Sequence, residues 1–166
     1  MEPFSNPLGF AVAIAGFSGI SIAIQSRDAK VDSIREFRNK NLIMWSLCAA
    51  FGSSLPEGVV YLGAEGSQVW SWSSYLYALF LVAVLYVPYS GRSKLAPSDR
   101  AQLSPAIWVL GVGGTALVAL AQVVNGLGWF HHPSAAPLYW GVLWMILFGA
   151  MQFYRNLFGP RGATDT

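Results

Sequence analysis

The chain has 166 residues and a net charge of +2; 54% of its residues are hydrophobic and only 11% are Asp, Glu, Lys or Arg. A soluble domain carries about 25% charged residues, so the composition excludes a soluble globular protein. An aromatic content of 14% excludes intrinsic disorder, and the single cysteine, Cys48, excludes a disulfide scaffold. The remaining class is a polytopic all-α membrane protein of one domain, residues 1–166, surrounded by the lipid bilayer.

Five stretches of the chain are long and apolar enough to cross a membrane, because a crossing helix needs about 20 mostly apolar residues. They are residues 8–25, 42–63, 69–88, 105–130 and 137–154. Glu57 is the one ionised group inside them. The sequence therefore predicts five transmembrane helices.

The first stretch is interpreted as a retained helix rather than a cleaved signal peptide. A signal peptide carries positive charge before its apolar stretch. Here residues 1–7 contain Glu2 and no Lys or Arg, and the positive charges, Arg27 and Lys30, come after the stretch.

Small residues predict close packing of two of the helices. Gly9, Ala13 and Gly16 follow one another at spacings of four and three residues, so they share a helix face that permits close approach of another helix. The fourth stretch carries a similar group: Gly111, Gly113 and Gly114. We expect these faces to pack against other helices, within or between chains.

All ten Lys and Arg residues lie outside the five apolar stretches, within residues 27–40, 92–100 and 155–161. With five spans, these three segments lie on one side of the membrane. Short cytoplasmic loops carry the excess of Lys and Arg, so we expect the N-terminus outside and the C-terminus inside. Trp and Tyr residues near the helix ends fit the aromatic belts of membrane interfaces.

Residues 26–41 form the longest polar segment. Val31, Ile34 and Phe37 recur every third residue, which predicts an amphipathic helix at the cytoplasmic interface, continuous with the second span. Its five cations are mixed with three anions, and this favours a solvated face with local ion pairs over an anionic-lipid patch. Residues 89–104 are expected to be a flexible linker.

An internal repeat aligns residues 55–63 with residues 120–128 at an offset of 65. Gly63 then corresponds to Gly128, and Glu57 to Gln122. The alignment predicts a parallel repeat of two-helix hairpins, the second and third spans matching the fourth and fifth. Repeats of this orientation occur in transporters.

Glu57 is the first candidate binding residue. It lies 17 residues beyond Lys40, roughly 25 Å along the helix and in the outer third of the bilayer. Pro56 frees a backbone carbonyl one turn earlier, where Ser53 and Ser54 can satisfy freed groups. This serine-lined turn predicts a cation or proton site; in the alternative, Glu57 reaches the outer interface or fixes helix packing.

Gln122 and Asn125 are the other candidates. They lie near the same depth, three residues apart and on one helix face. Together with Glu57 they offer acceptors and donors to an ion or small polar solute. The alternative interpretation is that both amides bond neighbouring helices to each other.

Catalytic and metal-binding patterns are not found. His131 and His132 are adjacent and point about 100° apart on a helix, so we expect no metal site there. Cys48 is expected to be a packing residue. A phosphate loop, HExxH and GxSxG are all missing from the sequence. We expect no enzyme activity, no cofactor and no nucleic-acid partner.

Two stretches, residues 38–47 (RNKNLIMWSL) and 137–158 (PLYWGVLWMILFGAMQFYRNLF), resemble a family of small five-helix bacterial inner-membrane proteins. The resemblance implies a multi-pass protein of the bacterial inner (plasma) membrane and brings no activity with it.

Two functions are compatible with these residues. The first is a small oligomeric channel or transporter with Glu57 as its central polar residue. The second is a non-catalytic subunit that packs against a larger membrane complex or against its own copies. Its expected partners are therefore further copies of the chain or other membrane subunits.

Overall fold

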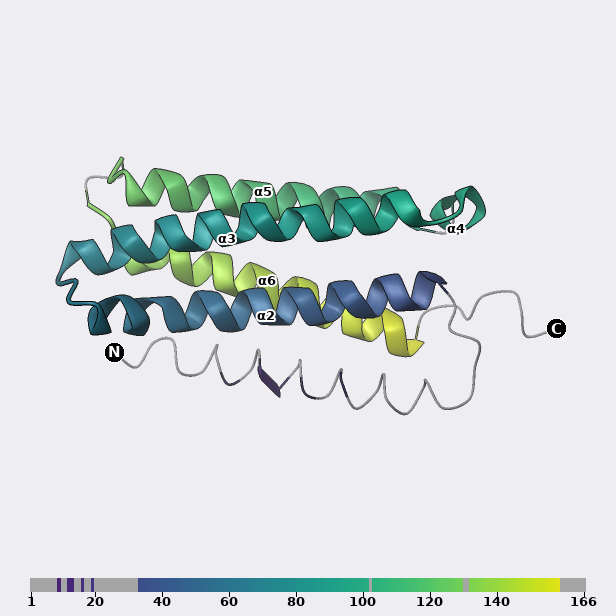
Figure 1. Cartoon of the computed structure of the whole chain (residues 1–166), viewed down its shortest axis with the longest axis horizontal. Coiled ribbons are helices and arrows are strands. Elements are labelled where there is room, and N and C mark those ends of the chain that lie inside the picture. The colour runs from purple at the N-terminus through teal and green to yellow at the C-terminus, as the bar shows by residue number, and fades with distance from the viewer. Residues whose placement is uncertain are drawn as a thin grey trace.

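The computed structural model describes residues 33–101, 103–129 and 132–158, together with Gly9, Val12, Ala13, Gly16 and Gly19. The elements are α2 (Ser33–Tyr61), α3 (Ser67–Lys94), α4 (Pro97–Ala101), α5 (Pro105–Gly126) and α6 (Ala135–Phe158) (Figure 1). Four of these helices are long and apolar enough to cross a membrane. The prediction of an all-α membrane protein is confirmed at this level.

The first predicted span, residues 8–25, lies largely outside the described residues. Its five described residues are helical and exposed. A Cβ atom added at Gly9, Gly16 or Gly19 would meet no other atom within 4 Å. At these positions, the small-residue face of this segment does not pack against the rest of the described chain.

The four long helices run side by side and alternate in direction (Figure 1). Helix α3 packs against α2 and α5, and α6 packs against the same two helices, so α2 and α5 lie diagonally across the bundle. We call the end with the α2–α3 and α5–α6 connections the hairpin end, and the end with α4 the basic end. The described Lys and Arg residues all lie at the basic end: Arg35, Arg38, Lys40, Arg92, Lys94, Arg100 and Arg155.

The connection at the basic end is more ordered than predicted. Helix α3 continues through a buried Pro88 to Lys94, and α4 follows two residues later. A membrane helix tolerates an internal proline because neighbouring groups satisfy the freed backbone. Arg100 donates from Nε to the Leu95 carbonyl at 2.8 Å and from Nη2 to the Ser93 carbonyl. The prediction of a flexible linker over residues 89–104 is therefore wrong for most of this segment.

The start of α2 is continuous with its membrane span, as predicted for the described part of residues 26–41. Glu36 and Lys40 form the expected local ion pair at 2.5 Å. Ile34 and Phe37, however, pack against Leu95 and Leu103 of the α3–α5 connection. The apolar stripe thus fixes this connection to α2 instead of lying on the membrane surface.

Glycines make room for aromatic rings in the core. Tyr77 is fully buried, and a Cβ atom at Gly52 would lie 2.6 Å from its Cζ atom. At Gly111 an added Cβ would lie 2.5 Å from Cζ of Phe148, and at Gly114 it would collide with the Trp144 ring. The predicted close packing occurs at these two positions of α5 but not at Gly113, where an added Cβ would meet no atom within 4 Å.

Helices α2 and α5 end in the same hydrogen-bonded turn. Gly63 has a φ of 89°, its N–H bonds to the Val60 carbonyl at 2.9 Å, and the next N–H, of Ala64, bonds to the Val59 carbonyl at 3.3 Å. This is the Schellman arrangement, in which glycine adopts the left-handed conformation. The same bonds recur 65 residues later. The N–H of Gly128, whose φ is 69°, bonds to the Asn125 carbonyl at 3.0 Å, and the N–H of Trp129 bonds to the Val124 carbonyl at 3.3 Å.

Candidate functional site

Glu57 lies on the outer surface of the bundle. Its side chain is exposed, one turn before α2 ends at Tyr61. Within the described residues its carboxylate has no ion-pair partner. This placement fits the alternative interpretation, a carboxylate close to the membrane interface, better than a site in the bundle interior.

The two serines before Pro56 bond within their own helix. Ser53 Oγ donates to the Ala49 carbonyl at 2.8 Å, and Ser54 Oγ donates to the Phe51 carbonyl at 2.9 Å. Pro56 deprives the Gly52 carbonyl of its usual partner, so neither hydroxyl bonds to the group that the proline frees. Ser53 is buried, whereas Ser54 is exposed on the side of α2 that carries Glu57.

Gln122 and Asn125 are buried and join α5 to its neighbours. Gln122 Nε2 donates to the Pro137 carbonyl at 2.8 Å. Asn125 Nδ2 donates to Ser74 Oγ at 2.8 Å and to the Ser134 carbonyl at 2.9 Å, and Asn125 Oδ1 accepts from the Ser134 N–H at 3.1 Å. These bonds are those expected of amides that hold helices together.

The predicted residues therefore do not form one group. Gln122 and Asn125 lie between α3, α5 and α6, whereas Ser54 and Glu57 lie on the outside of α2, which is not a neighbour of α5. A helix with apolar residues all round gives no sequence signal for the face on which a single carboxylate lies.

Three further polar atoms lie unpartnered in the interior. Ser73 Oγ, Tyr77 Oη and Gln122 Oε1 are buried without a hydrogen-bond partner. Ser73 and Tyr77 are four residues apart on α3, so they share a face. Neither residue was predicted as a site residue, although a Ser and a Tyr at this spacing within an apolar span are visible in the sequence.

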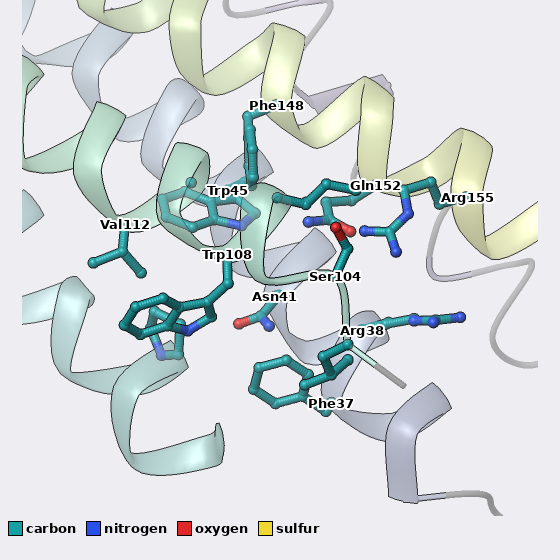
Figure 2. Close-up of a pocket in the computed structure, with 14 residues that line it drawn as sticks. Phe37, Arg38, Asn41, Trp45, Ser104, Trp108, Val112, Phe148, Gln152 and Arg155 are labelled. Carbon is teal, nitrogen blue, oxygen red and sulfur yellow. The ribbon is translucent and has the colours of Figure 1, made fainter. Parts of the chain in front are cut away.

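A cavity opens between α2, α3, α5 and α6 at the basic end (Figure 2). Its open volume is about 40 Å³. Arg38 and Asn41 reach it from α2, and Gln152 and Arg155 from α6, each pair being three residues apart. This site was not predicted from the sequence, because it joins residues more than a hundred positions apart.

Other candidate residues have simple environments. Cys48 is fully buried in the hydrophobic core, as expected of a packing residue. His132 is exposed, and His131 lies outside the described residues. Among the described residues, no three His, Cys, Asp or Glu side chains are grouped to hold a metal ion.

Fold and composition together define an all-helical, multi-pass membrane protein, with four candidate spans in the described part of the chain. No family model, curated protein or solved structure matches it.

Proposed function

We propose that the protein is a non-catalytic membrane subunit that binds another membrane-spanning chain, either its own copy or a different protein. The observation that carries this proposal is the separation of the polar residues. The amides of Gln122 and Asn125 are used in bonds inside the bundle, whereas Glu57 lies outside it. A carboxylate within a span is costly unless it meets a polar partner or the interface.

The exposed stripe around Glu57 suits helix contact. We define the α2 outer face as the exposed residues Leu47, Phe51, Ser54, Glu57, Gly58 and Tyr61. Small residues permit close approach of a second helix, and a serine or carboxylate can bond across such a contact. The exposed Gly9, Ala13 and Gly16 offer a second surface of the same kind.

Photo-crosslinking in the native membrane tests this contact. A photoreactive amino acid at Ser54 should form adducts with a partner chain, whereas one at Ala116, exposed on α5, should not. Gly16→Leu should reduce the size of the assembly in mild detergent. The proposal would be contradicted if the Ser54 crosslinker formed no adducts and Gly16→Leu left the size of the assembly unchanged.

The orientation of the subunit belongs to the same proposal: five spans in the bacterial inner membrane, N-terminus outside and C-terminus inside. The gathering of the described cations at the basic end supports it, because the positive-inside rule assigns that end to the cytoplasm. A membrane-impermeant maleimide should label Ser67→Cys in intact cells and Ser98→Cys only after permeabilisation. Labelling of Ser98→Cys in intact cells would refute this topology.

The parallel repeat is also proposed. Its support is the matched ends of α2 and α5, which carry the same turn at an offset of 65 residues. The two helices present different faces to the core, since Gln122 is buried whereas the corresponding Glu57 is exposed. In such a repeat, the two turns are alike, whereas α2 and α5 differ in the face that each turns toward the core.

A channel or transporter for an ion or small polar solute is the second candidate function. The unpartnered atoms of Ser73, Tyr77 and Gln122 favour it, because they offer hydrogen bonds inside the bundle. Ion and proton flux into reconstituted vesicles, measured across a pH series for the wild type and Glu57→Gln, decides between the functions. Flux that depends on Glu57 would support transport. If the wild type gave no flux under any gradient, the channel or transporter function would be excluded.

A further inference from the structure

We propose that the cavity at the basic end binds a phosphate group. The site is separate from the α2 outer face and does not depend on the proposed subunit role. Its walls carry two guanidinium groups and several neutral donors, and no described acidic residue lines it.

The donors around the cavity are unused by the protein. Arg38 Nε and Trp108 Nε1 are buried without a hydrogen-bond partner. A buried donor that bonds to nothing costs free energy, so such donors indicate a group that completes them. Asn41 and Gln152 are buried beside them, and each brings an amide N–H₂ group.

Within the part of the chain that the structure describes, the charges of the cavity are also uncompensated. Of the described carboxylates, Glu36 pairs with Lys40 and Asp99 accepts a hydrogen bond from Ser33, while Glu57 and Glu65 are remote, near the hairpin end. Among the described residues, Arg38 and Arg155 therefore line the cavity without an acidic partner, and two like charges at one cavity repel each other.

A phosphate group fits this pair better than a carboxylate. Guanidinium forks bond phosphate oxygens two at a time. A phosphate monoester carries close to two negative charges near neutral pH and can balance both arginines, whereas one carboxylate balances only one.

The start of α5 adds to the positive potential. Ser104 lies at the N-cap position of this 22-residue helix and lines the cavity, but its side chain makes no capping hydrogen bond. The free N–H groups of a helix start favour an anion. Ser104 Oγ is thus available as a further donor.

The rest of the wall is apolar and suits the organic part of a ligand. Trp45, Trp108 and Phe148 line it, and Arg92 lies over the Trp108 ring at 4.5 Å. The open volume is about 40 Å³, below the roughly 300–1,000 Å³ of drug-sized sites, so the cavity is too small for a whole ligand of that size. At one end of the bundle, the phosphate can come from a lipid headgroup or from a free solute.

Thermal unfolding of the full-length protein in a zwitterionic detergent tests the proposal. Inorganic phosphate should raise the melting temperature, whereas sodium chloride at the same ionic strength should not, because only a ligand of the folded state stabilises it. Micelles with phosphatidic acid, compared with phosphatidylcholine, test the lipid source. Stabilisation by phosphatidic acid alone assigns a headgroup, and stabilisation by inorganic phosphate assigns a free anion; no effect from either overturns the proposal.

Matched variants locate the site. Arg38→Gln and Arg155→Gln should each weaken binding of the stabilising probe by roughly tenfold or more, since each removes charged hydrogen bonds. Lys94→Gln removes an exposed cation at the same end that does not line the cavity, and it should bind as the wild type does. Equal affinities of all three variants would overturn the proposal.

A structural role of the arginines gives a different result. Without phosphate, Arg155→Gln should unfold at the same temperature as the wild type or higher, because it removes a repulsion. A lower melting temperature that phosphate does not change would mean that Arg155 supports the fold only. Arg155→Lys keeps the charge but loses the fork, so its affinity should fall between those of the wild type and Arg155→Gln.

Discussion

The two ends of the bundle differ in the polar groups that they pair, although Ser73 Oγ, Tyr77 Oη and Gln122 Oε1 also lie buried and unpartnered in the half toward the hairpin end. At the hairpin end, Asn125 makes three hydrogen bonds to Ser74 and Ser134, and Ser71 Oγ bonds to the Gly126 carbonyl at 2.8 Å. At the basic end, Arg38 Nε and Trp108 Nε1 are buried without partners beside a cavity. The first end is organised for packing, and the second has the donors of a binding site.

The difference indicates where substitutions should affect folding and where they should affect binding. In the half of the bundle toward the hairpin end, helices are held by ring contacts and side-chain bonds, so changes there should reduce stability. At the basic end the unpartnered donors contribute little to the fold, so changes there should alter affinity. The Arg38 and Arg155 variants described above test the basic end, and three substitutions test the half toward the hairpin end.

Gly52→Ala should have the largest effect. The added Cβ would lie 2.6 Å from Cζ of the fully buried Tyr77, and overpacking of this kind costs about 2 kcal/mol. Gly58→Ala is the matched control, because an added Cβ there meets nothing within 4 Å. Denaturant-induced unfolding in detergent measures both. Equal stability of the two variants would show that Tyr77 can move aside.

Asn125→Ala should have an intermediate effect. It removes the bonds to Ser74 and Ser134 that connect α5 with α3 and the start of α6, and interhelical bonds of this kind contribute about 1–2 kcal/mol at most. The same unfolding measurement serves, with Ser90→Ala as the control, since Ser90 Oγ bonds only to Val87 of its own helix. If Asn125→Ala lowered the unfolding free energy no more than Ser90→Ala does, ring packing alone would stabilise this end.

Glu57→Gln should have the smallest effect on the isolated chain. The side chain is exposed, and exposed substitutions change stability by about 0.5 kcal/mol or less. The unfolding free energy of the purified variant checks this. A drop as large as that of Asn125→Ala would mean that the carboxylate is bonded within the fold.

The sequence predicted the helices well because apolar length is a strong signal. The expected spans at 42–63, 69–88, 105–130 and 137–154 each overlap an observed helix, although α2 and α5 end earlier, at Tyr61 and Gly126, and α3 runs on past Pro88 to Lys94. The predicted span ends at Pro88, yet a buried proline in a packed bundle removes only one backbone hydrogen bond and lets the helix continue. The close packing at Gly111 and Gly114 was also predictable from their spacing.

The candidate site was predicted only in part. Depth along a helix follows from residue count, so Gln122 and Asn125 were correctly expected to lie near each other. The face of the helix on which a side chain lies does not follow from residue count when the helix is apolar all round. The exposure of Glu57 was therefore not predictable from the sequence. The cavity at the basic end depends on tertiary packing of α2 against α6, which brings Arg38 to Arg155.

The two glycine turns have a consequence for membrane insertion. Only residues 62–66 and 127–134 connect helices at the hairpin end, and Glu65 is the one charged residue among them. In the orientation proposed above, each helix pair enters the bilayer as a unit, with a short turn as its leading edge. In hydrocarbon every backbone N–H needs an internal partner. The bonds that Gly63 and Gly128 make possible supply such partners during translocation, so we expect these glycines to matter most for the yield of correctly inserted protein.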